Sequence, residues 1–371
     1  MKYLNYLLIP GLLLIFAACN RSGDNKVYLG ADLSYVNEME DCDGEFRENG
    51  KVMDPYELFA NKGCNLVRVR LWNNPAWSGY SDYKDVELTI RRSKAQGMEV
   101  LLDFHYSDTW ADPQHQVIPK AWENISELSV LGDSLYNFTY NTLMKLAAKN
   151  ILPELVQVGN EVNIEIMQPE DSMNVSSINW ERNIYLLNLG IKAVKDVAQK
   201  AGKEIQIVIH IAQPENALWW FDEAEKNELS GYDWIGLSYY PKWSTYKFDD
   251  IPQAIDSLRK KFNKRVMIVE TAYPFTFENA DEAGNILGED ALIPNYPATP
   301  EGQLKYMTHL VKLTLQGGGE GVIYWEPAWI STRCSTPWGQ GSHWDNAIFF
   351  DAKNGNGALS AFGFFDKENY K

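Results

Sequence analysis

Two glutamates, Glu161 and Glu270, each stand at the end of an almost wholly apolar run, residues 155–160 and 266–269. A carboxylate in this position is costly unless it is paired or has a function. Cleavage of a glycosidic bond needs two carboxyl groups, one to protonate the leaving oxygen and one to attack the anomeric carbon or activate water. A rim salt bridge explains one such glutamate equally well, but it explains two of them less well.

The two runs belong to a set of eight apolar, β-branched segments that alternate with segments of helical periodicity. This alternation predicts a parallel sheet, and eight strands can close it into a barrel. An open doubly wound sheet is the alternative, but no glycine-rich phosphate turn follows the first run. We therefore predict an α/β fold, a single-domain (β/α)8 TIM barrel. The predicted strands are Val27–Tyr35, Leu66–Trp72, Glu99–Tyr106, Leu155–Asn160, Ile205–Ile211, Trp234–Tyr239, Val266–Thr271 and Val322–Glu326, and the helical segments include Tyr56–Lys62, Val86–Gln96, Ser134–Lys149, Trp180–Ala201, Ile251–Lys261 and Glu301–Gln316.

In this fold the active site lies at the C-terminal ends of the strands. The fourth and seventh strands are on opposite sides of the mouth, so their glutamates can converge to the ~5 Å separation of a retaining enzyme. Arg68 and Arg70 alternate on one strand and share a face, so either could keep Glu270 ionised. A salt bridge with Asp32 or Asp103 is their alternative role.

Other polar and aromatic residues at strand ends are candidates for substrate binding. The histidines could bind sugar hydroxyls or be structural. No His-x-His or His-x-x-His pair occurs, which argues against a metal-dependent hydrolase barrel. Trp325 is the favoured stacking platform, whereas the other tryptophans at strand ends could equally be packing residues: Trp72, Trp110, Trp329, Trp338 and Trp344. The candidates are Asp32, Arg68, Arg70, His105, Asp108, Trp110, Asn160, His210, Tyr239, Tyr240, Trp325 and Trp329.

Several of these stretches carry a family resemblance. Asn160-Glu161, Glu270 and the aromatic-rich eighth strand resemble the clan of retaining barrel glycosidases, and within it the chain is similar to glycoside hydrolase family 53, the endo-β-1,4-galactanases. The long third-strand stretch is the most specific, and the matches run from about residue 28 to the C-terminus. They are Gly30–Ser34, Val67–Pro75, Leu102–Pro113, Gln157–Asn163, Gly236–Pro241, Glu270–Pro274 and Tyr324–Trp329.

The resemblance implies endo-acting, retaining hydrolysis of galactan or type I arabinogalactan, the neutral side chains of pectin. Glu161 would be the acid/base, with its pKa raised by burial and by the second carboxylate, and Glu270 would be the nucleophile. Asn160 would bind the substrate 2-OH, and Tyr239 or Tyr240 would orient Glu270. The alternatives are a mannanase or xylanase of the same clan, or a non-catalytic glycan-binding lipoprotein, which would need neither glutamate.

Some family members hold a structural calcium ion in the loop after the seventh strand. Here Asn279, Asp281 and Asn285 could ligate, but Ala283 stands where a side-chain ligand would be expected. Calcium takes roughly six to eight oxygen ligands, so this depletion favours an ordinary acidic loop. The chemistry itself requires no cofactor.

The N-terminus resembles a bacterial secretory signal, because an apolar run over Leu7–Ala18 is too short to span a membrane. Phe16-Ala17-Ala18-Cys19 resembles a lipobox, in which Cys19 receives the lipid. We expect an exported lipoprotein of the outer membrane, facing outward because a polymer cannot enter the cell. The expected parts are residues 1–18 as signal peptide, 19–27 as lipidated cysteine and flexible tether, and 28–371 as catalytic domain.

The composition of the chain indicates which classes of molecule it can bind. The net charge of −16 repels nucleic acid and anionic membrane surfaces, so a neutral polysaccharide is favoured and membrane contact is expected only through the lipid. The 13 Trp and 20 Tyr offer flat faces for sugar rings, although most should be core. A monomer is expected. Cys42, Cys64 and Cys334 allow one disulfide and one free thiol, and the sequence does not choose the pair.

Overall fold

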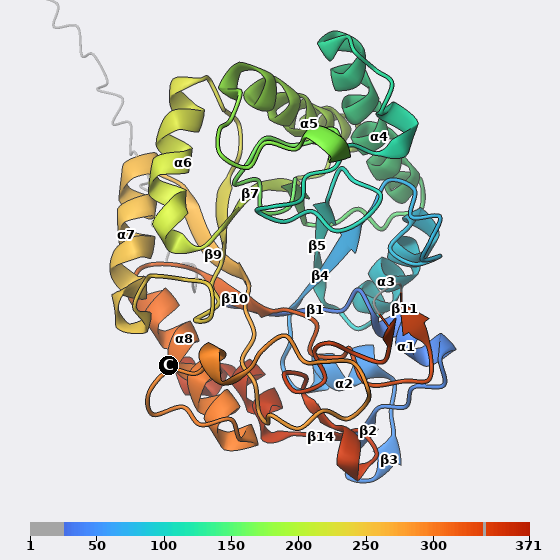
Figure 1. The fold of residues 1–371 in the computed structure, drawn as a ribbon, viewed down its shortest axis with the longest axis vertical. Helices are drawn as coiled ribbons and strands as arrows, with labels where there is room; N and C mark the ends of the chain where they lie inside the picture. Colours follow the sequence, from blue (N-terminus) through green and yellow to red (C-terminus); the bar gives the residue numbers. More distant parts are fainter. Residues whose placement is uncertain (1–25, 337–338) are drawn as a thin grey trace, which may run out of the picture.

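Eight parallel strands close into a barrel in the computed structural model, which describes residues 26–336 and 339–371. Neighbours along the chain are neighbours in the sheet, in the order β1-β10-β9-β8-β7-β6-β5-β4, and pairing of β1 with β4 closes the ring (Figure 1). The predicted barrel is confirmed, with every predicted strand present. The strands are β1 Tyr28–Asp32, β4 Leu66–Leu71, β5 Glu99–Phe104, β6 Leu155–Val158, β7 Gln206–Ala212, β8 Trp234–Ser238, β9 Arg265–Glu270 and β10 Gly321–Tyr324.

Helices connect successive strands and surround the barrel (Figure 1). Asp54, Asp82, Asn179 and Thr299 each begin a helix by accepting a hydrogen bond from a first-turn amide. The helix after β5 begins at Leu128, earlier than predicted. The helices are α1 Val36–Asp41, α2 Pro55–Asn61, α3 Tyr83–Ala95, α4 Leu128–Ala148, α5 Trp180–Ala201, α6 Pro214–Lys226, α7 Ile251–Phe262 and α8 Pro300–Gln316.

The segment after β10 contains short elements in place of an eighth crossover helix. Phe362 of the 3₁₀ turn η6 packs on Phe59 of α2, with ring centroids 4.9 Å apart, so this turn fills the remaining gap between α8 and α2. The 3₁₀ turns are η1 Lys120–Trp122, η2 Glu170–Ser172, η3 Phe248–Asp250, η4 Glu289–Ala291, η5 Ala352–Asn354, η6 Ser360–Phe365 and η7 Lys367–Tyr370, and the short strands are β2 Arg47–Glu48, β3 Lys51–Val52, β11 Ser335–Thr336, β12 Gly339–Gln340, β13 Phe350–Asp351 and β14 Gly357–Ala358.

The cysteine pairing, which the sequence left open, is between Cys42 and Cys334. This disulfide joins the end of α1 to the long loop after β10. Cys64 is a free thiol and is buried.

The barrel interior changes from apolar to polar along the strands. The part of the interior farther from the C-terminal ends of the strands is a separate apolar cluster to which every strand contributes: Tyr28, Leu66, Leu101, Leu155, Val208, Trp234, Met267, Val269 and Ile323. Nearer the C-terminal ends the inward positions are charged or polar, and they are as deeply buried as the cluster below. They include Arg68, Asp103, Gln157, His210 and Ser238. Because buried polar groups must find partners inside the protein, this layer forms a hydrogen-bonded network.

Two predictions fall outside the part of the chain described here. The signal peptide, Cys19 and most of the tether precede residue 26, and Trp338 lies in the gap at 337–338. Among the helices of residues 26–336 and 339–371, none combines the length and the apolar character that crossing a membrane requires.

Candidate active site

A pocket opens at the C-terminal mouth of the barrel and contains most of the predicted site residues. Both glutamates lie in its wall, from opposite sides of the ring. The pocket is lined by Asp32, Arg68, Arg70, His105, Trp110, Ala111, Asp112, Asn160, Glu161, Glu270 and Trp325. Charged groups therefore concentrate where the strands end, as expected for a barrel enzyme.

The carboxylates of Glu161 and Glu270 converge across the pocket. An oxygen of one lies within 4.8 Å of an oxygen of the other, and each residue is 8% exposed. Retaining glycosidases hold their two carboxyl groups about 5–5.5 Å apart, whereas inverting enzymes leave a wider gap for a water molecule. The spacing therefore fits direct attack by one carboxylate.

Local backbone irregularities aim both glutamates into the pocket. Val269 points into the barrel core, so strict alternation would turn Glu270 outward. A bulge between β8 and β9 pairs Ser238 with Glu270 and skips Val269, which returns Glu270 to the inside. Glu161 has a φ of 44°, in the left-handed region that costs a non-glycine residue on the order of 1–3 kcal/mol. Such strain is typical of functional sites.

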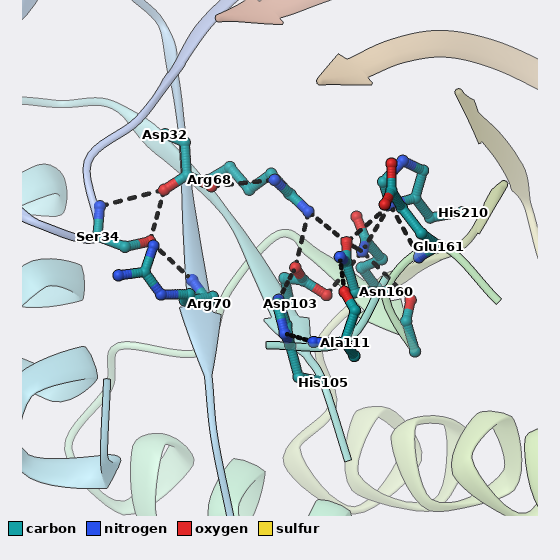
Figure 2. A network of polar contacts seen from close by, with 12 residues as sticks. Asp32, Ser34, Arg68, Arg70, Asp103, His105, Ala111, Asn160, Glu161 and His210 are labelled. Atoms are coloured by element: carbon teal, nitrogen blue, oxygen red, sulfur yellow. Dashed lines mark hydrogen bonds and ion pairs between the residues drawn. The ribbon is translucent and has the colours of Figure 1, made fainter. Parts of the chain in front are cut away.

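Arg68 is the centre of the polar network (Figure 2). One terminal nitrogen donates to Asp32 Oδ2 at 3.0 Å and to Glu270 Oε2 at 2.9 Å. The other donates to Asp103 Oδ2 at 2.7 Å and to Asn160 Oδ1 at 2.6 Å. Arg68 thus combines the two roles that the sequence offered to the arginines: it forms an ion pair with Glu270 and it forms the interior salt bridges with Asp32 and Asp103.

Arg70 has a different partner. It forms an ion pair with buried Glu326, and its guanidinium lies over the rings of Tyr35 and Trp110, at 4.3 and 4.4 Å from their centroids. Trp110 lies 5.8 Å from Trp325, so the pair supports an aromatic wall of the pocket.

The two glutamates experience different electrostatic surroundings. Burial raises the pKa of Glu161 well above its usual value, and the charge of Glu270 raises it further. Burial also raises the pKa of Glu270, but Arg68 and the hydroxyl of Tyr240, which donates to Oε1 at 2.9 Å, oppose the rise. These surroundings favour a proton on Glu161 and a charge on Glu270. The acid/base and nucleophile roles of the two residues stay a prediction.

Five predicted residues do not line the pocket, although one of them, Tyr240, contacts Glu270. The Tyr239 hydroxyl donates to Tyr246 O, so Tyr240 is the tyrosine of the site. Asp108 accepts from the amides of Asn74 and Lys120 and shapes a loop. Trp329 stacks on another ring, and His210 is buried beneath the two glutamates.

Sequence reasoning missed Asp112, Ser238 and Gln157. Asp112 lines the pocket, while Ser238 and Gln157 support it from below. Alternation from Trp234 places Ser238 on the inner face of β8, and a polar residue there was the available signal.

The loop after β9 gathers the residues considered for calcium. Asn285 donates to Asn279 Oδ1 at 2.5 Å and to Asp345 Oδ1 at 2.7 Å, and the Ser331 hydroxyl contacts both Asp281 and Asp345. Asp345, which the sequence analysis missed, adds a second carboxylate whose pKa is raised by burial. The two carboxylates and two amide oxygens are hard donors of the kind calcium prefers, but they are fewer than the roughly six to eight oxygens that it takes. Calcium binding stays a prediction.

Comparisons with known proteins agree with this geometry. Residues 28–365 match the family model described as Glycosyl hydrolase family 53. The arabinogalactan endo-beta-1,4-galactanase of Cellvibrio japonicus is 56% identical over 360 residues, covering 97% of this chain and 96% of the relative. The endo-beta-1,4-galactanase of Bacillus subtilis is 34% identical, covering 83% and 72%. Among solved structures, the GH53 catalytic domain of Ignisphaera aggregans matches with a TM-score of 0.83 and 31% identity, covering 93% of this chain and 97% of that one.

Proposed function

The chain belongs to glycosyl hydrolase family 53, and on that premise we propose that it cuts internal β-1,4-galactosidic bonds of galactan and type I arabinogalactan with retention of configuration. The observation that carries the reaction type is the convergence of two buried carboxylates within 4.8 Å, in surroundings that favour a proton on Glu161 and a charge on Glu270. The polymer is inferred from the relatives named as galactanases.

In the first step Glu270 attacks the anomeric carbon while Glu161 gives its proton to the departing glycosidic oxygen. The bond to the leaving sugar breaks and an ester bond to Glu270 forms. In the second step Glu161, now a carboxylate, takes a proton from water, and the water oxygen displaces Glu270. Two inversions at one carbon give net retention.

The electrostatics of the pair allow Glu161 to change from acid to base. The negative charge of Glu270 is one of the causes that raise the pKa of Glu161. Esterification removes that charge, so the pKa of Glu161 falls as the intermediate forms. The same residue thus donates a proton in the first step and accepts one in the second.

Aromatic rings beyond the pocket support action within a polymer. Trp77 is 41% exposed and lies 5.1 Å from Trp72, which lies 5.3 Å from Trp110 at the pocket wall. Trp72 is buried and links the exposed ring of Trp77 to the pocket wall, so Trp77 can stack on a sugar beyond the pocket.

The decisive experiment incubates the protein with galactan, arabinan, mannan and xylan and measures new reducing ends, with proton NMR to follow the anomer first formed. We expect release of β-anomers from galactan. Activity on mannan or xylan with none on galactan would favour the alternative polysaccharidases, and binding without cleavage would favour a glycan-binding protein.

The nucleophile is tested with Glu270→Gln, which should abolish turnover while galactan binding persists. Glu204→Gln, an exposed glutamate between α5 and β7, is the matched control and should behave as wild type. Near-normal turnover by the Glu270 variant would refute the assignment.

We also propose that Cys19 carries a lipid anchor and that the enzyme faces outward from the outer membrane, on the basis of the lipobox-like sequence. Labelling with a fatty-acid analogue, lost in Cys19→Ser, tests the anchor. Equal galactan digestion by intact and lysed cells tests the outward orientation. A monomer is proposed because both glutamates and the arginine that contacts Glu270 belong to the same barrel, and light scattering tests it.

A further inference from the structure

Ser238 links the acid/base to a buried histidine. It ends β8, is fully buried, donates to Glu161 Oε1 at 2.5 Å and lies 2.8 Å from His210 Nε2. His210 is equally buried on the neighbouring strand β7. The three side chains therefore form one continuous path of hydrogen bonds from the pocket into the protein.

The protons along this path can be placed by counting. A serine hydroxyl has one proton. Because Ser238 donates that proton in its hydrogen bond to Glu161, its oxygen must accept a hydrogen bond from His210. Nε2 of His210 then carries a proton. Burial and the charge of Arg68 lower the pKa of His210 well below its usual value, so the ring is neutral and Nδ1 has no proton.

The surroundings of Nδ1 agree with this tautomer. The amide nitrogen of Gln157 lies 3.1 Å from Nδ1 and the backbone N–H of Glu161 donates to it at 3.4 Å. Asn160 Oδ1 is also near, at 2.9 Å, and it accepts a proton from Arg68 at 2.6 Å. One of the two protons of the Gln157 amide goes to Asp103 Oδ1 at 2.6 Å, which leaves one for Asn160 Oδ1 or for Nδ1. The opposite tautomer would turn the Ser238 hydroxyl toward His210 and leave Glu161 Oε1 without this donor.

We propose that Ser238 and His210 are positioning residues that direct the acid proton of Glu161 to Oε2, the oxygen left for the departing sugar. Oε1 accepts from Ser238, so a proton on Oε1 would face the hydroxyl hydrogen. When Glu161 has given up its proton, the same hydrogen bond stabilises the carboxylate that serves as base. This inference rests on the proposed function, which supplies the acid/base role of Glu161.

Other charged and titratable groups also face Glu161. Glu270 on β9 and Asp112 after β5 raise its pKa, whereas Arg68 on β4 lowers it, and Tyr240 lies within electrostatic range. His210 itself faces Arg68, whose positive charge opposes its protonation, and His105 is the other titratable group near it. Ser238 is one of several groups that set the pKa of Glu161. Removing its hydroxyl should therefore shift the pH profile only by the effect of one hydrogen bond.

The test is the pH dependence of kcat/KM for Ser238→Ala with galactan. Because the hydrogen bond favours the ionised form, its loss should move the alkaline limb upward by about one pH unit, the tenfold effect typical of a hydrogen bond to a charged group. kcat on galactan should fall about tenfold. The fall should be smaller with a dinitrophenyl galactobioside, whose leaving group needs no acid.

Two further variants separate positioning from packing. His210→Gln retains an N–H near the Nε2 position and should keep more activity than His210→Ala. Ser93→Ala removes a buried hydroxyl on α3, outside the site, and should leave the pH profile unchanged whatever it does to stability.

A folded Ser238→Ala enzyme with a wild-type alkaline limb would overturn the proposal. If that variant fails to fold, ¹⁵N NMR of the wild type decides. The protein has 5 histidines, so the ring signals of His210 can be assigned, and the proposal requires its proton to be on Nε2. A proton found on Nδ1 refutes the proposed positioning of Glu161 by Ser238 and His210. Wild-type protein that does not cleave galactan would instead refute the proposed function, and the tautomer would still be measurable.

Discussion

Replacing Tyr240 with phenylalanine removes one hydroxyl and leaves the ring in place. That hydroxyl donates to Glu270 Oε1 at 2.9 Å, and burial together with the nearby carboxylates raises its own pKa well above the usual value, so it remains a donor. The neighbouring tyrosine supplies a matched control, since the Tyr239 hydroxyl donates to the Tyr246 carbonyl at 3.3 Å, away from the pocket. Both rings are buried.

The size of the effect follows from the hydrogen bond. A hydrogen bond to a charged group contributes about 1.5–3 kcal/mol. At 1.36 kcal/mol per pKa unit this equals roughly one to two units, and because Arg68 still contacts Glu270 we expect about one. The bond favours the ionised nucleophile, so its loss raises the pKa of Glu270 and moves the acidic limb of kcat/KM to higher pH.

The assay is the pH profile of kcat/KM on galactan for wild type, Tyr240→Phe and Tyr239→Phe, with the melting temperature of each. The Tyr240 variant should lose about tenfold in kcat/KM on the acidic side of the optimum, and the Tyr239 variant should keep the wild-type limb. Equal profiles for both variants, or a shift only in the Tyr239 variant, would refute the reasoning.

Three further predictions concern stability. Burial raises the pKa of Glu38 to about 7, so the protonated side chain stabilises the fold below about pH 4 and this stabilisation is lost as pH rises through 7. Relative to wild type, Glu38→Gln should therefore raise the free energy of unfolding by on the order of 1–2 kcal/mol at pH 8 and leave it unchanged at pH 4, as measured by urea denaturation. Cys42→Ser with Cys334→Ser should lose about 2–4 kcal/mol, because the disulfide joins positions 292 residues apart, while reductant should not destabilise that double variant further. Calcium should raise the melting temperature of the wild type but not of Asp345→Asn; an equal response of both would place the ion elsewhere.

The sequence could predict the barrel and the placing of Glu161 and Glu270 at its mouth because both depend on local pattern. Eight apolar runs require eight buried strands, and a carboxylate that ends such a run must lie at the mouth. The sequence decided least about residues at the edges of elements. Trp329 stands just beyond a strand, where either packing or substrate binding was open, and its ring stacks on Tyr35.

The sequence by itself determined which residue types stand at the barrel mouth, and the tertiary structure decided which of them meet. Arg68 and Arg70 share a face of their strand, and only the folded structure shows that Arg68 contacts Glu270 whereas Arg70 contacts Glu326. A bulge at Val269 turns Glu270 inward against the alternation of its strand. The physical reason is that patterning specifies burial, whereas hydrogen-bond partners depend on distances between side chains brought together from different strands.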